Sequence, residues 1–314
     1  MKRFVKKIAV ITIIISILTA GVNALYIRNS PNCGTMGEKK NDEAYIADVP
    51  EHIQLCNFGN SHGYYGFDYS SYASEWTCYN FSLPAQSMSY NYRILENYRE
   101  NIAPGAVVLI CVSPQTFFEP PETESDDFES INKRYYHFLD REYIKEYDLK
   151  TDFFVSYLPI LSVSLTDVVN TFLHDNPDYW NNTTNPEDAF SHGLNRYSPV
   201  LDGDGKLIIN EEELDAAYHM VELCREIGAL PIFVTVPYLS AYTDAIQDKY
   251  TSFFDELFAL MDQMCEDTQT EYHCYAFDER FSSNYDYFFN SDHLNRMGAA
   301  AFTKLLMEEV VNVQ

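Results

Sequence analysis

Two short blocks at opposite ends of the chain hold the residues that could carry out acyl chemistry. Gly59–His62 (GNSH) follows an apolar run, and Asp292–Asn295 (DHLN) precedes an amphipathic one. A serine becomes a nucleophile when a histidine takes its proton, and that histidine needs a partner to orient its ring. Each block alone also fits a structural role, as a helix N-cap or a solvated loop histidine. The hypothesis therefore requires that folding bring Ser61 and His293 into hydrogen-bonding reach.

The elements expected around these blocks alternate between short strands and longer helices. We expect strands at 52–58, 77–82, 106–112, 230–236 and 272–277, and helices at 86–101, 211–227, 250–265 and 297–311. The run 106–112 (AVVLICV) is continuously apolar, which is typical of a strand buried on both faces. This alternation predicts a three-layer α/β/α domain with a central parallel sheet. Ligands bind at the C-terminal ends of such strands, where Ser61 is expected.

The N-terminus predicts a membrane anchor. A basic cluster in the first seven residues precedes 8–27, a stretch without any charge. As a helix this stretch is about 30 Å long, enough to cross a bilayer. The basic flank is expected to stay in the cytoplasm, which places the following domain outside the cell membrane as a single-pass protein. A signal peptide cleaved at 22–24 is the alternative, although the apolar run exceeds the roughly 7–15 residues typical of signal peptides.

The chain is expected to have three parts. Residues 1–27 form the flank and anchor, 28–48 a polar linker, and 49–314 the α/β domain. An acidic, aromatic and then Asn-rich insertion interrupts this domain at about 115–210. The insertion fits either packed decoration or a lid that faces the substrate.

The blocks resemble those of the SGNH/GDSL hydrolase superfamily, in particular its membrane-anchored envelope branch related to the teichoic-acid D-alanyl transfer protein. Gly59–His62 is similar to the nucleophile block, and Asp292–Asn295 to the last block. Residues 80–86 look like the second block, with Ala85 at the usual oxyanion-hole glycine. Residues 113–115 (SPQ) look like the Ser-Pro-Gln of the D-alanyl transfer branch. The resemblance spans 52–310 apart from the insertion.

This resemblance implies a flavodoxin-like fold and a serine-dependent O-acyl esterase or acyltransferase that acts on a cell-envelope glycan or teichoic-acid-like polymer. Ser61 would be the nucleophile and His293 the general base and then acid. Oxyanion donors would come from Ser61, Ala85 and Gln115. Such a mechanism needs no metal and no cofactor. The acylated envelope polymer is the expected partner.

The chain departs from the family at the triad acid. That acid usually stands three residues before the histidine, where this chain has Asn290. An amide orients an imidazole but cannot neutralise its cation, so Asp292, next to His293, is the other candidate for the role. The alternative function follows from this departure: a catalytically weakened or inactive glycan-binding or assembly partner of a membrane acyltransferase.

Composition argues against two other classes of ligand. The formal net charge of −26 repels phosphate backbones, so nucleic acid is not an expected partner. Residues 201–206 mimic part of a calcium-binding EF-hand loop, but Val200 stands where the first ligand should be an Asp. We therefore expect a turn at this position and no metal site.

Overall fold

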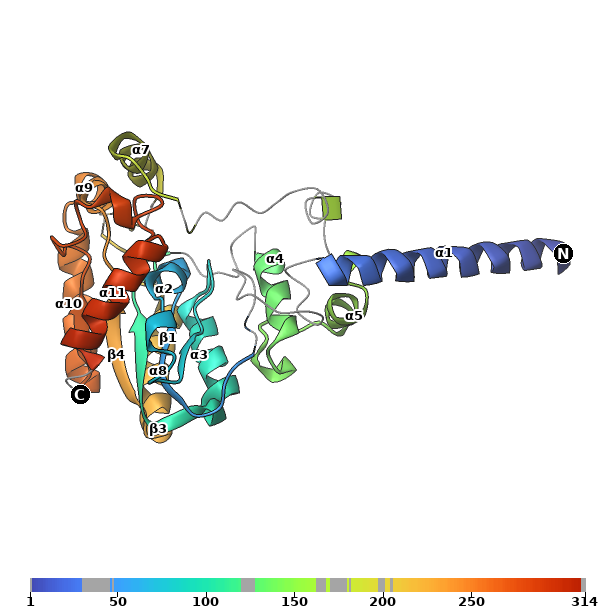
Figure 1. Ribbon diagram of the computed structural model, residues 1–314, viewed down its shortest axis with the longest axis horizontal. Helices are drawn as coiled ribbons and strands as arrows, with labels where there is room; N and C mark the ends of the chain where they lie inside the picture. Colours follow the sequence, from blue (N-terminus) through green and yellow to red (C-terminus); the bar gives the residue numbers. More distant parts are fainter. Residues whose placement is uncertain are drawn as a thin grey trace. The chain divides into compact units, whose positions relative to one another are not determined.

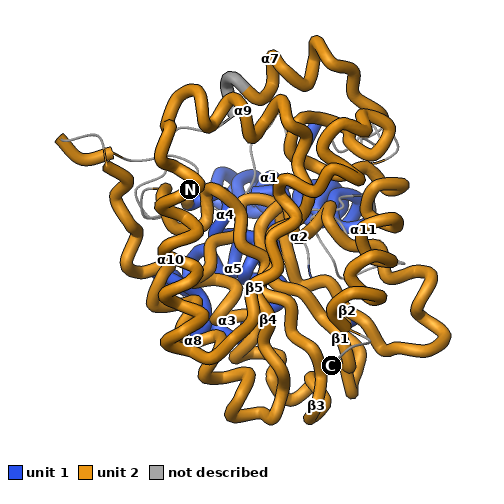
Figure 2. Tube along the Cα trace, turned by 90° about the vertical axis from the view of Figure 1, so that its left-hand side faces the viewer, with its two compact units in different colours: residues 1–48, 129–176 blue, residues 49–128, 177–314 orange. Residues whose placement is uncertain are grey.

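The computed structural model describes residues 2–29, 46, 48–119, 128–161, 168–169, 180, 182–196, 201–203 and 206–311. The chain divides into two compact units (Figure 2). Unit 1 comprises residues 1–48 and 129–176, and unit 2 comprises residues 49–128 and 177–314. Three of the expected segments lie partly outside the described residues: most of the linker, part of the insertion, and residues 204–205 of the expected turn.

Unit 2 is built on a five-stranded, entirely parallel sheet. Its strands are β1 (Ile53–Phe58), β2 (Cys78–Asn80), β3 (Ile102–Cys111), β4 (Leu230–Thr235) and β5 (Glu271–Cys274), in the order β2-β1-β3-β4-β5. This is the flavodoxin-like order, and its direction reverses between β1 and β3. The predicted parallel α/β sheet is confirmed, and its switch point lies where Ser61 follows β1.

Helices cover both faces of the sheet. Figure 2 shows α3 (Met88–Tyr98), α8 (Glu211–Glu226) and α10 (Phe253–Thr268) on one side, with α2 (Ser61–Gly66) and α11 (Arg296–Glu309) on the other. Helix α3 packs against α8, and α2 packs against α11. Two further helices, α7 (Pro186–Arg196) and α9 (Ser240–Lys249), pack against each other. The predicted three layers are therefore present.

The central strand β3 forms the middle of the core. Val108, Leu109 and Ile110 are consecutive and fully buried, as expected for a strand covered on both faces. The strand begins at Ile102 rather than at the expected residue 106, and so includes a Pro-Gly pair that reads as a break in the sequence. Its register against β1 shifts in this region, and Gly105 adopts a positive φ of 82°. A β-bulge thus accommodates the pair within the strand.

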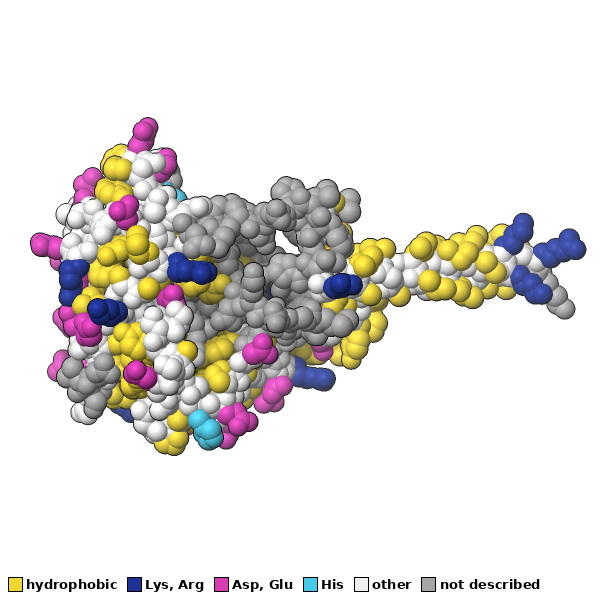
Figure 3. Space-filling model, viewed as in Figure 1, with side chains coloured by type: hydrophobic (Ala, Val, Ile, Leu, Met, Phe, Trp, Pro, Cys, Tyr) yellow, Lys and Arg dark blue, Asp and Glu magenta, His cyan; other side chains and the backbone are white. Residues whose placement is uncertain are grey.

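Unit 1 contains the long N-terminal helix α1 (Lys2–Asn29), shown in Figure 1. Its segment Arg3–Arg28 is long and apolar enough to cross a membrane. Figure 3 shows hydrophobic side chains along α1 and Lys and Arg side chains at its N-terminal end. The unit also contains most of α4 (Phe128–Lys133), α5 (Leu149–Tyr157) and a 3-10 turn at Pro159–Leu161.

Candidate active site

The turn after β1 places Ser61 at the C-terminal edge of the sheet, as the first residue of α2. Asn60 is the N-cap of this helix, and its Oδ1 accepts from the backbone N–H of His62 at 3.0 Å. The amide nitrogen of Asn60 donates to Ser113 Oγ at 2.8 Å. The side chain of Asn60 therefore ties the serine turn to the residues that follow β3.

Glycines allow this turn to pack closely on the neighbouring strand ends. A Cβ atom at position 59 would come within 2.6 Å of Cys111 Cβ, and one at Gly63 would collide with the Ser82 hydroxyl. Beneath the turn, the buried Asn57 donates to Asn80 Oδ1 and to Ser82 Oγ, both at 2.8 Å. Close packing and this polar network fix the height of Ser61 above the sheet.

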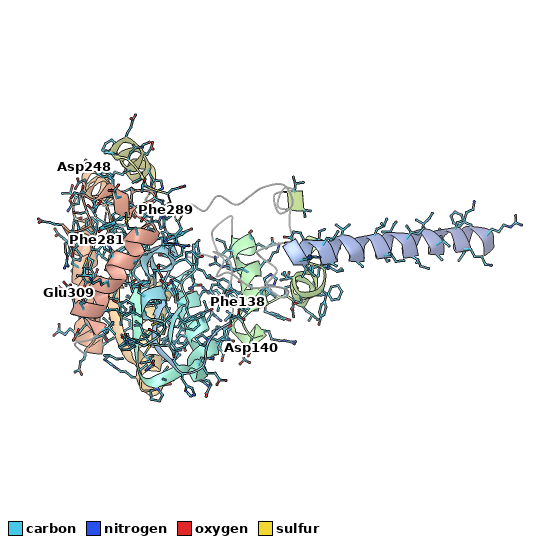
Figure 4. The ribbon with its side chains drawn as sticks, in the orientation of Figure 1. Phe138, Asp140, Asp248, Phe281, Phe289 and Glu309 are labelled. Atoms are coloured by element: carbon cyan, nitrogen blue, oxygen red, sulfur yellow. The ribbon has the colours of Figure 1, made fainter. Side chains whose placement is uncertain are left out.

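A tight loop before α11 positions His293. Asn290 Oδ1 accepts from the backbone N–H of Asp292 at 3.1 Å and from that of His293 at 2.8 Å. Asn295 caps α11 by accepting from Gly298 N at 3.0 Å. Phe289, labelled in Figure 4, belongs to the same loop, and its backbone N–H donates to His293 O. Asn290 and Asn295 thus hold both ends of the histidine segment.

Ser61 and His293 are in direct contact, as the hypothesis requires. Ser61 Oγ lies 2.8 Å from His293 Nε2, and both side chains are almost fully buried. The imidazole is held between two stacked rings, His62 with a centroid distance of 4.8 Å and Phe289 with one of 5.4 Å. The expected proximity of the two residues is confirmed, and the ring has little freedom to turn away.

Both candidate orienting residues reach the other nitrogen of this ring. His293 Nδ1 lies 3.0 Å from Asn290 Nδ2, 3.1 Å from Asn290 Oδ1 and 3.2 Å from Asp292 Oδ1. Burial raises the pKa of Asp292, but the charges and hydrogen bonds of His293 and His62 outweigh it and hold the pKa well below its usual range. A buried, ionised carboxylate therefore lies beside His293, although position 290 carries an amide.

His62 is a member of this cluster that the sequence analysis left without a role. Its Nε2 lies 3.1 Å from Asp292 Oδ2, and its Nδ1 lies 3.1 Å from Asn60 Oδ1. That amide atom is an oxygen, because it accepts the backbone N–H of His62. Both ring nitrogens thus face acceptors, and only the doubly protonated imidazolium donates from both. The adjacent positions of His62 and Ser61 at the start of α2 are the sequence signal that could have indicated this contact.

His192 also borders the site, and it comes from the expected insertion. Its Nδ1 lies 2.7 Å from Ser291 Oγ and 3.6 Å from Asp292 Oδ1, and its side chain is partly exposed. His192 belongs to α7, so at least this helix of the insertion lies next to the candidate catalytic residues.

The three expected oxyanion donors differ in their surroundings. As the first residue of α2, Ser61 has a backbone N–H with no partner inside the helix. Ala85 is exposed and adopts a left-handed φ of 52°, the conformation that glycine favours, and its loop is tied to Gly59 O by Leu83 N and Gln86 Nε2. The amide of Gln115 donates instead to Tyr242 Oη at 2.7 Å. Oxyanion binding by these groups remains a prediction.

His62, Asp292 and His293 also have the spacing of a metal site, since one ligand atom from each lies within 4.8 Å of the others. A metal-binding histidine offers a bare ring nitrogen. Here both nitrogens of His62 face acceptors, and His293 Nε2 faces the serine hydroxyl. Hydrogen bonding accounts for the cluster without an ion.

In unit 2, the hydroxyl of Ser61 contacts a buried histidine that lies beside a buried carboxylate, at the switch point of a parallel sheet. Neither a protein-family model nor a curated protein matches the chain.

Proposed function

We propose that this protein is a serine-dependent O-acyl esterase or acyltransferase that acts on a cell-envelope glycan or teichoic-acid-like polymer. The observation that carries the proposal is the continuous chain of contacts from Ser61 through His293 to the buried carboxylate of Asp292. The likeness of the serine and histidine blocks to SGNH hydrolases supports the same reaction class. Helix α1 would anchor the chain in the cell membrane with unit 2 on the outer side, where such polymers are assembled.

In the first half of the reaction, Ser61 Oγ attacks the carbonyl carbon of the bound ester while His293 Nε2 takes the hydroxyl proton. Negative charge develops on the carbonyl oxygen, where the N–H groups of Ser61 and Ala85 would donate. The tetrahedral intermediate collapses when His293 returns the proton to the leaving sugar oxygen. An acyl group then remains on Ser61.

In the second half, His293 takes a proton from water or from an acceptor hydroxyl, which attacks the acyl carbonyl. Collapse of this intermediate breaks the bond to Ser61, whose oxygen recovers its proton from His293. Water as the attacking group gives hydrolysis, and a sugar hydroxyl gives acyl transfer. Both outcomes use the same residues.

Asp292 is the triad acid in this mechanism, and His62 is a positioning residue that acts through it. The carboxylate lies 3.2 Å from His293 Nδ1, where it stabilises the imidazolium formed in each step. His62 holds the second carboxylate oxygen and supplies a positive charge to the buried pair. Asn290 contributes by fixing the backbone of the loop.

Hydrolysis of p-nitrophenyl acetate by the full chain in detergent tests the proposal. We expect Ser61→Ala to abolish turnover, because it removes the nucleophile without adding bulk to a packed turn. Ser70→Ala is the matched control, since Ser70 is an exposed residue of a 3-10 turn. Equal rates for the wild type and Ser61→Ala would refute the proposal.

The surroundings of Gln115 support a second candidate, a glycan-binding or assembly partner of a membrane acyltransferase. One N–H of the Gln115 amide donates to Tyr242, which leaves one fewer donor for an oxyanion. This function predicts that cells producing the Ser61→Ala protein keep normal polymer acylation. Loss of acylation in those cells would favour the enzyme.

A further inference from the structure

Unit 1 exposes an apolar stripe along α5. Leu149, Phe153 and Tyr157 are spaced four residues apart and so share one face of the helix. Their exposed fractions are 69%, 51% and 69%, and Leu161 in the following 3-10 turn is 57% exposed. Val155 is buried. A row of large apolar side chains turned outward indicates an interaction surface.

The C-terminal end of this stripe is attached to α1. Asn23 Nδ2 donates to Tyr157 O at 3.1 Å, and Asn23 Oδ1 accepts from the backbone N–H of Ile160 at 3.3 Å. Tyr26 is fully buried. Among the α1 residues whose side chains the structure describes, Asn23 and Tyr26 are the buried ones, and nearly all the others are exposed. The 3-10 turn at Pro159–Leu161 therefore covers the last turns of α1.

These contacts set the depth of α5 relative to a bilayer. The uncharged stretch 8–27 is about as long as the hydrocarbon core is thick, so Asn23 would lie about 6 Å inside its outer end. A backbone segment that hydrogen-bonds to Asn23 must lie at nearly the same depth. Apolar side chains held at this depth reach the boundary between headgroups and acyl chains, roughly 5–10 Å deep.

We propose that α5 and the turn after it form a membrane-interface element, with the stripe Leu149–Phe153–Tyr157–Leu161 in contact with lipid beside α1. The inference goes beyond the esterase proposal and rests on insertion of α1. Aromatic side chains such as Phe153 and Tyr157 favour the membrane interface. Lipid is the occupant because the contact with α1 sets this depth without a second protein.

Tryptophan reporters in the full chain test this placement. We would reconstitute each variant into phosphatidylcholine–phosphatidylglycerol vesicles and measure quenching by lipids brominated near the headgroup or in the middle of the acyl chain. Phe153→Trp and Tyr157→Trp report on the stripe, and Leu18→Trp reports on the middle of α1. Glu142→Trp is the exposed control within unit 1, two residues after Asp140, which Figure 4 shows away from α1. The two native tryptophans are subtracted with the wild type.

We expect quenching of the two stripe reporters to exceed that of Glu142→Trp by at least about twofold, with the stronger effect from bromines near the headgroup. Leu18→Trp should be quenched best by bromines in the middle of the chain. If Leu18→Trp is quenched but the stripe reporters behave as Glu142→Trp does, the interface element is refuted and the anchor stands. If no reporter is quenched, both are refuted. Ester hydrolysis is measured separately, so failure here leaves the esterase proposal standing.

Discussion

At the scale of single residues, the candidate site combines one buried negative charge with two histidine rings. Asp292 bridges His62 and His293, which stack on each other with an interplanar angle of 13°. An ionised carboxylate is costly to bury unless opposite charges and donors surround it. His62 donates to the second carboxylate oxygen, and its charge adds to that of His293 in lowering the pKa of Asp292.

Asp292→Asn should lower kcat strongly. The amide keeps the shape of the side chain but cannot neutralise the imidazolium, and the equivalent change in a serine protease costs about 10⁴ in turnover. We expect a loss of about 10²–10⁴ here, because Asn290 still orients the ring. The measurement is kcat for p-nitrophenyl acetate at neutral pH.

Adding Asn290→Asp to this variant should restore part of the activity, because it places a carboxylate 3.1 Å from the same nitrogen. Full activity of the single Asp292→Asn variant would show that this carboxylate is not the triad acid.

His62→Gln should move the pH profile as well as the rate. Glutamine still offers a donor to Asp292 but removes the positive charge stacked on His293. Without that charge, the pKa of Asp292 should rise toward its usual range, so the loss of kcat/KM on acidification should begin at a higher pH. A purely structural role would lower kcat/KM without moving the profile. His219→Gln on α8, on the opposite side of the sheet, should leave the profile unchanged.

The sequence identified part of this site in advance. Ser61, Asp292 and His293 stand in two recognisable blocks, Asn290 lies two residues before the second block, and these four residues are together in the structure. The sequence shows His62 next to Ser61 but does not indicate its partner. Its contact with Asp292, at the far end of the chain, depends on how α2 and α11 pack. His192 could not be assigned, since no local pattern shows that α7 folds back toward the loop before α11.

At the scale of elements, a buried carboxylate joins the helices on one face of the sheet. Glu213 of α8 accepts from the backbone N–H of Met88, from that of Ser89 at 3.2 Å and from Ser89 Oγ at 2.9 Å. These groups form the first turn of α3, where N–H groups lack helical partners and negative charge is favourable. Glu213 therefore fixes the position of α3 on α8.

Glu213→Ala should destabilise unit 2, because it leaves these buried donors unpaired. We expect the free energy of unfolding to fall by about 2–4 kcal/mol. Glu222→Ala, at an exposed position on the same helix, should change it by less than about 0.5 kcal/mol. Urea unfolding followed by circular dichroism measures both variants. Equal stability of the two variants would show that the carboxylate does not support α3.

Hydrophobic patterning predicted most of the helices and strands, and the errors in their predicted bounds have physical causes. The strands at 53–58 and 230–235 and the helix Glu211–Glu226 lie within a residue or two of their expected bounds. The predicted start of β3 was wrong because a β-bulge allows Pro104 and Gly105 to lie within the strand. Helix α10 begins at Phe253 rather than at residue 250, because the preceding α9 ends only at Lys249. Such boundaries depend on packing as much as on local composition.

At the scale of the whole molecule, the N-terminal helix α1 has two features. It is long and apolar enough to cross a membrane, and its last turns pack inside unit 1. Its residues at 23 and 26 are buried within unit 1, so the helix is part of that unit. Cleavage at 22–24 would remove Asn23, which binds the backbone of Tyr157 and Ile160. These contacts favour the uncleaved anchor over the signal peptide.

Mass spectrometry of the protein purified from membranes tests this point. We expect peptides that keep Ala24 joined to Leu25, and retention of the chain in the membrane pellet after alkaline carbonate washing. An N-terminus at Leu25 together with release by carbonate would show that the segment is a cleaved signal.

The central claim, that Ser61 is an activated nucleophile, is tested most directly by covalent labelling of the full chain with a fluorophosphonate probe. The contact of 2.8 Å with His293 predicts one label per chain, located on the peptide that contains Ser61. Labelling should be lost in Ser61→Ala and His293→Ala and kept in Ser70→Ala. If the wild type stays unlabelled while a known serine esterase reacts beside it, the chain does not carry an active serine nucleophile.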